Sequence, residues 1–436
     1  MTLYLQAKFG FSSATTSMLY GTFLALVYFL PIFGGIIADK WLGYGKTIFA
    51  GVTIMFAGYL LLGLPFGSGS AGITIMLLSL FLIAAGTGLF KGNLQALVGK
   101  IYDDPRFSKG RDMAFSIFYM FINIGAFFAP SMGNWITNNV LAKENYFYDA
   151  TIPANYNKLN DETVDADAFI AELKAKHPEY AQLATKELDQ KISAAKKKAG
   201  VMFPEDEAQV LHDLRIAALR QYTKAGLVSD PQLQITDADH EILISRDAKD
   251  EPAKFAINER VAMLQIPAEW TADLNSKLNA ERVDRGEAAQ ELSFERAFGE
   301  HYVSTTLSQS YSLSFFVACI SLIISILIFV LCRKTWKAAD VTVKQAKAMA
   351  AQGDSSAHVV EMSKAEVKER LIALGLVFFV VIFFWMAFHQ NGLTMTFFAR
   401  DYTVSRVDAA GYMPFSLLML IPFICLSLIH ISEPTR

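Results

Sequence analysis

Long segments without a charged side chain decide what this chain can fold into. No Asp, Glu, Lys or Arg occurs in residues 9–38, 47–90, 113–135, 313–332 and 371–399, and a further apolar segment begins near residue 412. The run PFGSGS at 65–70 divides the second segment in two, because Gly and Pro mark turns. A helix needs about 20 apolar residues to cross a hydrocarbon layer about 30 Å thick. The sequence therefore predicts an all-α membrane protein with several spans.

Charged side chains gather instead in the middle of the chain. Residues 136–310 hold 50 of the 81 Lys, Arg, Asp and Glu residues and are net acidic, whereas the flanks are net basic. Helical patterns at 168–174 and 268–283, with breaks at Pro204, Pro231 and Pro267, predict a helical insert. Two roles stay open for it, a cap or partner contact and a tolerated insertion. The charge split argues against nucleic-acid binding.

The spans and the insert define the expected organisation. We assign 1–135 to the end of a first helix and to helices two to five, 136–310 to the insert, 311–333 to helix six, 334–370 to a linker, and 371–430 to helix seven and the start of helix eight. Residues 1–6 look like the end of a helix, and the tail ISEPTR at 431–436 ends an apolar run abruptly. We therefore expect a fragment of a longer protein, with its first and last helices incomplete and inactive on its own.

Basic residues are distributed unequally between the two sets of loops. Loops 39–46, 100–112 and 333–370 contain 14 Lys and Arg residues, whereas loops 7–14, 65–72 and 400–410 contain three. Short loops rich in Lys and Arg stay in the cytoplasm. We therefore expect a multi-pass protein of the inner (plasma) membrane, with the insert on the periplasmic side.

A motif of small and acidic residues, GGIIADKWLG at 34–43, lies where a span meets the cytoplasm. Gly34 and Gly35 would let helices approach closely. Asp39 could accept hydrogen bonds from a neighbouring helix end, and Gly43 permits a tight turn. These four residues are candidates for a structural or gating motif; a generic interfacial turn is the alternative.

Three further motifs lie within the spans, GTGLFKGN at 86–93, FSIFYMFINIGAF at 115–127 and FWMAFHQ at 384–390. Together with residues 34–43 they resemble signatures of the proton-dependent oligopeptide transporter family of the major facilitator superfamily. The resemblance covers about 1–135 and 311–420. It implies a major facilitator-type helical bundle, here about helices one to eight, and proton-coupled symport of di- and tripeptides by alternating access. The family's Glu-x-x-Glu-Arg-Phe motif of the first helix does not occur in the chain.

Lys91 is the one formal charge between residues 47 and 99. It lies eight residues before Gly99, about 12 Å from the cytoplasmic boundary, and an ionisable group at that depth is a functional candidate. The resemblance implies that Lys91 attracts the peptide carboxylate and takes part in proton coupling. Tyr28 and Asn123, each about 16 Å deep, are implied substrate contacts. Snorkelling of Lys91, packing of Tyr28 and a helix–helix hydrogen bond of Asn123 stay open.

The motif at 384–390 contributes Trp385 and Gln390, which the resemblance also implies as substrate contacts. Trp385 and His389 are four residues apart and share one helix face. His389 stands where the family usually has Asp or Glu, so the contact to a substrate ammonium is in doubt. We consider His389 a candidate for proton coupling, because histidine titrates near neutral pH; a hydrogen bond between helices is the alternative.

The resulting hypothesis is a proton-coupled di- and tripeptide symporter, driven by the proton gradient without a cofactor or metal. Its expected partners are the peptide, protons and the lipid bilayer, and any partner of the insert is unknown. Two alternatives stay open, transport of another small solute and a membrane-anchored receptor or scaffold acting through the insert. We do not expect an enzyme, because the spans contain no nucleophile–base pair or metal set.

Overall fold

The computed structural model describes residues 1–398 except 65, 68, 104–105, 246, 285–287, 343–344, 346–362, 393 and 396–397. Two compact units divide the chain. The insert unit comprises Leu3–Ser13 and Asn134–Tyr311, and the membrane unit comprises Ala14–Gly133 and the described residues from Ser312 onward. The segment expected from residue 412 and the tail 431–436 lie outside the described residues.

The described residues contain six helices long and apolar enough to cross a membrane. These six helices confirm the predicted spans. Five of them are α2 (Ser13–Ile37), which the π-turn η1 (Ala38–Leu42) extends, α3 (Tyr44–Gly63), α4 (Ser70–Ile101), α5 (Arg111–Lys143) and α17 (Lys364–Phe388). The sixth comprises α13 (Phe294–Glu300), the π-turn η5 (His301–Leu307) and α14 (Ser308–Leu331). Short turns η2 (Ser108–Gly110), α15 (Arg333–Trp336), η6 (Lys337–Ala339) and η7 (His389–Gly392) complete the membrane unit.

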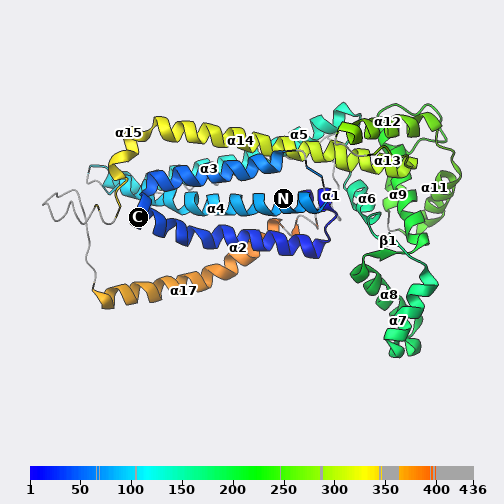
Figure 1. Cartoon of the computed structure of the whole chain (residues 1–436), viewed down its shortest axis with the longest axis horizontal. Helices are drawn as coiled ribbons and strands as arrows, with labels where there is room; N and C mark the ends of the chain where they lie inside the picture. The colour runs from blue at the N-terminus through cyan, green and yellow to red at the C-terminus, as the bar shows by residue number, and fades with distance from the viewer. Residues whose placement is uncertain are drawn as a thin grey trace. The chain divides into compact units, whose positions relative to one another are not determined.

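Helices α3 and α4 run side by side (Figure 1), and glycines allow their close packing. A Cβ atom on Gly51 would lie 2.8 Å from the carbonyl oxygen of Gly86, and one on Gly86 would lie 2.6 Å from the carbonyl oxygen of Gly51. Small residues bring helix backbones together where lipid offers no hydrophobic driving force. The pattern of glycines thus fixes this helix pair.

Gly34 brings α2 against α4 in the same way. A Cβ atom at Gly34 would lie 2.2 Å from the carbonyl oxygen of Gly88, whereas one at Gly35 would meet no atom within 4 Å. The side-chain amide of the buried Asn93 donates to the carbonyl of Gly34 over 3.0 Å. Of the two predicted small residues, Gly34 is therefore the one at a helix contact.

The insert unit is a bundle of short helices. Its elements are α1 (Thr2–Phe9), α6 (Thr151–Lys158), β1 (Glu162–Thr163), α7 (Ala166–Lys176), η3 (Pro178–Gln182), α8 (Thr185–Ala199), β2 (Val201–Met202), α9 (Pro204–Lys224), α10 (Asp237–Ile244), η4 (Ala248–Asp250), α11 (Glu251–Met263), α12 (Ala268–Asp284), α13 and η5. Helices α7 and α12 confirm the two predicted helices. The two short strands pair in parallel.

A continuous apolar core holds these helices together. Leu141 of α5, Leu214 of α9 and Phe298 of α13 are fully buried in it. Ala7 of α1 belongs to the same core, and the side-chain amide of Asn157 donates to the carbonyls of Gln6 and Ala7 over 2.8 and 3.2 Å. The residues expected to end the first membrane helix therefore pack with the insert.

Two details of the insert differ from expectation. Pro204 is the first residue of α9 and does not interrupt a helix, because proline at this position has no hydrogen bond to lose. The expected boundaries of the insert, at residues 135 and 311, fall inside helices. Helix α5 continues to Lys143, and the helical span that includes α14 begins at Phe294.

Candidate functional site

Four of the predicted site residues meet in the membrane unit, and we call Tyr28, Lys91, Trp385 and His389 the aromatic–lysine cluster. The Lys91 Nζ atom lies 4.6 Å from the centre of the Tyr28 ring, a cation–π distance. The Tyr28 ring lies 6.0 Å from the Trp385 ring and 5.4 Å from the His389 ring. Three helical segments far apart in the sequence, α2, α4 and the end of α17, therefore contribute to one cluster.

Helix periodicity explains how the end of α17 and the first residue of η7 supply two of these side chains. Trp385 and His389 are separated by four residues and stack, with ring centres 5.4 Å apart and an angle of 26° between the rings. The Phe388 ring meets the His389 ring edge-on at 5.9 Å. The His389 ring is thus held on several sides by aromatic rings.

The hydrogen-bonding groups of the cluster are incompletely paired. The Nε2 atom of His389 is buried and has no hydrogen-bond partner among the described residues. Lys91 has no ion-pair partner there either, and its side chain is exposed. Tyr28 keeps 43% of its surface exposed, so a ligand can reach its ring. The cluster therefore offers one positive charge and one free imidazole nitrogen to a bound molecule.

Asn123 and Gln390 lie differently from these four residues. Asn123 is exposed on α5, and its side chain makes no hydrogen bond to any described residue. The Gln390 amide donates to the carbonyl of Met386 over 3.3 Å and accepts from the Thr394 hydroxyl over 2.6 Å. Their roles as substrate contacts stay predictions.

The motif at 34–43 forms a tight corner between α2 and α3. The Tyr44 hydroxyl donates to the Asp39 carboxylate. Gly43 adopts φ of 81°, a conformation that favours glycine, and its carbonyl accepts from the Thr47 hydroxyl over 2.7 Å. Asp39 and Gly43 therefore shape the connection between α2 and α3.

Three residues that the sequence did not single out hold this corner to the segment after α14. The Asp340 carboxylate accepts from the Gly45 backbone N–H over 3.0 Å, and Lys100 Nζ donates to the Val341 carbonyl over 3.1 Å. Trp336 packs so close to Gly45 that a Cβ atom there would lie 2.3 Å from its ring. We call Lys100, Trp336 and Asp340 the loop clamp. No local pattern predicts it, because each of these contacts joins residues more than 200 positions apart in the sequence.

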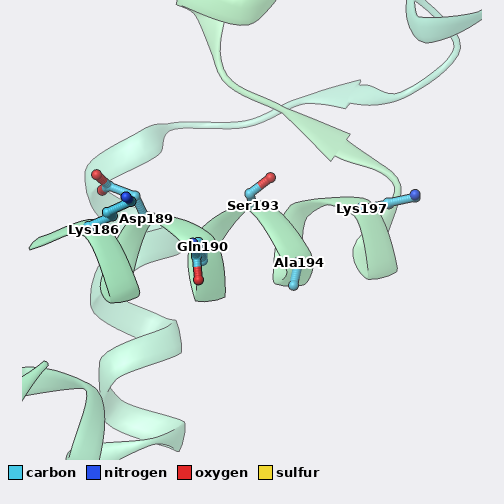
Figure 2. Close-up of a pocket in the computed structure, with 6 residues that line it drawn as sticks. All are labelled: Lys186, Asp189, Gln190, Ser193, Ala194 and Lys197. Carbon is cyan, nitrogen blue, oxygen red and sulfur yellow. The ribbon is translucent and has the colours of Figure 1, made fainter. Parts of the chain in front are cut away.

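Some hollows of the described chain offer no such chemistry. Figure 2 shows one that six residues line, all on α8, namely Lys186, Asp189, Gln190, Ser193, Ala194 and Lys197. Ser193 and Ala194 point to opposite sides of the helix there, so these residues do not enclose a ligand. The described residues contain no group of three or more His, Cys, Asp or Glu side chains that could hold a metal ion.

Part of the chain matches a known protein family. Residues 45–154 match the model of the POT family. The chain carries a POT family segment. Two of the four motifs, at 86–93 and 115–127, lie inside this segment, and the match confirms the resemblance inferred from them.

Sequence relatives support the POT family assignment. A "Di-/tripeptide transporter" of Lactobacillus helveticus is 38% identical over 128 residues, which are 29% of this chain and 24% of the relative. "Dipeptide and tripeptide permease A" of Escherichia coli (strain K12) is 38% identical over 138 residues, 31% of this chain and 26% of the relative. The chain thus matches about a quarter of the length of these curated relatives.

Solved structures of POT proteins resemble the chain only weakly. Tetrameric PepTSo2 covers 77% of this chain and 95% of its own, at 17% identity and a TM-score of 0.28. A peptide transporter POT mutant in complex with alafosfalin covers 78% of this chain and 92% of its own, at 17% identity and a TM-score of 0.25.

Proposed function

We propose that the whole protein takes up di- and tripeptides together with protons, by alternating access across the inner membrane. The observation that carries this proposal is the aromatic–lysine cluster, in which Lys91 lies within the POT family segment and meets Tyr28, Trp385 and His389. The names of the two sequence relatives support a peptide as the substrate. Such a protein is a transporter that leaves its substrate chemically unchanged, and a proton gradient would drive it without a cofactor.

Each member of the cluster has a role in this proposal. The Lys91 ammonium attracts the carboxylate of the peptide, because a charge-assisted hydrogen bond is stronger than a neutral one. The rings of Tyr28 and Trp385 line the path of the substrate, and Asn123 and Gln390 would approach it when helices rearrange. Lys91 and His389 are the candidates for carrying the transported proton, since both are ionisable and both contact Tyr28.

The proposed placement has the loops that contain Lys40, Lys100 and Lys109 in the cytoplasm and the insert in the periplasm. The distribution of Lys and Arg residues supports it. The lipid bilayer surrounds the exposed apolar faces of α2, α5 and α17. Nucleic acid is not an expected partner.

Uptake by the purified whole protein in proteoliposomes tests this function. The vesicles are made alkaline inside, and accumulation of a radiolabelled dipeptide is measured for the form with a free amino terminus and for its N-acetylated form. We expect at least one form to accumulate above the level without a gradient, and a protonophore to abolish the difference. Folded protein that accumulates neither form would refute the proposal, and accumulation that ignores the protonophore would refute proton coupling.

A further inference from the structure

We propose that the aromatic–lysine cluster selects peptides whose carboxylate is free and whose amino end is uncharged, such as N-acylated peptides. In this proposal His389 forms a hydrogen bond with the uncharged amino end. The proposal rests on the proposed function and names the substrate class of the same site. It follows from what the described residues around Lys91 offer to the two ends of a peptide.

The charged side chains around the cluster favour a peptide carboxylate over a peptide ammonium. Lys91 presents a positive charge with no carboxylate partner among the described residues. The acidic residues described in the membrane unit lie outside the cluster, in connections or at helix ends, namely Asp39, Asp103, Asp112, Asp340, Glu366 and Glu369. A peptide carboxylate therefore finds its counter-charge in this part of the protein, whereas a peptide ammonium finds only a like charge. The uncharged amino end avoids that repulsion.

The aromatic rings do not bind the peptide ammonium in place of an acidic side chain. A ring face can bind an ammonium group, but Lys91 Nζ already lies over the Tyr28 ring at 4.6 Å. The His389 ring stacks on Trp385 at 5.4 Å. A second cation on either of these ring faces would have to displace Lys91 or His389.

The His389 imidazole supplies the complementary feature. Its Nε2 atom is buried without a hydrogen-bond partner, and Tyr28, Trp385 and Phe388 surround the ring. In neutral imidazole one nitrogen donates and the other accepts. An acylated amino end carries both an N–H and a carbonyl, so it can pair with Nε2 in either tautomer. An ammonium group has donors alone and brings a charge.

The acyl group itself also fits these surroundings. Rings of Tyr28, Trp385 and Phe388 provide apolar surface next to Nε2, and a small acyl methyl group would bury its surface there. The cluster therefore combines a cation, an unpaired imidazole nitrogen and apolar rings, which match a carboxylate, an amide and a methyl group.

Competition between matched peptides tests the proposal. Purified whole protein in proteoliposomes is given Ala-Phe and N-acetyl-Ala-Phe, each labelled in turn and competed by the other. For the wild type we expect the acetylated peptide to compete at least tenfold better. His389→Glu supplies an anion and should reverse the order by a similar factor, whereas His389→Gln, an uncharged control that can donate and accept, should keep the wild-type order.

The outcomes separate the two proposals. A wild type that takes the free peptide equally well or better overturns this inference and leaves the transport function standing. An order unchanged by His389→Glu removes His389 from the recognition of the amino end. Failure to take up either peptide by folded wild type refutes the transport function itself.

Discussion

At the scale of single residues, local spacing predicted much of the aromatic–lysine cluster. Lys91 was a candidate because a single charged side chain inside an apolar segment is energetically costly. The spacing of four residues placed Trp385 and His389 on one helix face. The contact of Tyr28 with all three was not derivable from spacing. It depends on how α2, α4 and α17 pack, which no local pattern encodes.

Gly34 and Gly35 allow the same substitution to be compared at a packed and at an open position of α2. Gly34→Ala would place a Cβ atom against the Gly88 carbonyl, and overpacking of this kind costs about 1–3 kcal/mol. Gly35→Ala meets open space inside a helix and should raise stability by about 0.4–1 kcal/mol, because alanine restricts the unfolded chain more than glycine does. The measurement is the free energy of unfolding of each variant in detergent micelles. Equal effects of the two substitutions would contradict the packing of α2 on α4.

At the scale of elements, the six spans were predictable because freedom from charge over about 20 residues is a strong signal. Helix ends were harder to predict. Helix α5 continues past residue 135 because polar residues that leave the membrane can stay helical, and hydropathy does not register that. The packing of Ala7 in the insert core was also unpredictable, since it joins segments more than 130 residues apart.

The loop clamp gives a prediction for one element. Asp340→Ala removes the acceptor of the Gly45 N–H, and a hydrogen bond to a charged group contributes about 1.5–3 kcal/mol. We therefore expect the backbone amides at the start of α3 to exchange hydrogen about tenfold faster or more. Asp103→Ala is the control, because Asp103 forms an exposed ion pair with Arg111 and exposed pairs contribute little. Unchanged exchange in Asp340→Ala would show that the clamp does not hold α3.

His240 gives the insert a pH dependence. Burial, and then the nearby charge of Arg220, lower the pKa of His240 below its ordinary value of 6.5, although Asp149 and Asp237 oppose this. The folded insert therefore binds a proton less readily than the unfolded one. The contribution of His240 to the stability of the insert is fully present above about pH 6.5. Below that pH the free energy of unfolding decreases by at most about 1.4 kcal/mol per pH unit.

Hydrogen exchange of α10 in the complete chain, measured between about pH 7 and pH 5 and corrected for intrinsic rates, follows this loss. His240→Gln should reduce the dependence in that range. The lowered pKa of Asp237, which Lys224 causes by its hydrogen bond, acts only at lower pH. A variant that keeps the wild-type slope would assign the pH dependence to other groups.

At the scale of the whole molecule, the motifs predicted the family and the segregation of charge predicted an insert. Orientation is a prediction that labelling can test. In a background without the native cysteines, Ser193→Cys on the exposed face of α8 should react with a membrane-impermeant maleimide added to intact spheroplasts. Lys109→Cys should react only after the membrane is opened. The reverse pattern would place the insert in the cytoplasm.

Binding of the peptide carboxylate by Lys91 can be tested by comparing an acid with its amide. Competition for uptake is measured with an N-acetylated dipeptide and with its C-terminal amide, for wild-type whole protein and for Lys91→Gln at equal membrane expression. Loss of a charge-assisted hydrogen bond of about 1.5–3 kcal/mol predicts that the variant binds the acid about tenfold to more than a hundredfold more weakly. The amide should bind the wild type poorly and lose little more in the variant. Unchanged competition by the acid in Lys91→Gln, as expected for a lysine that only snorkels to the interface, would show that Lys91 does not bind the carboxylate.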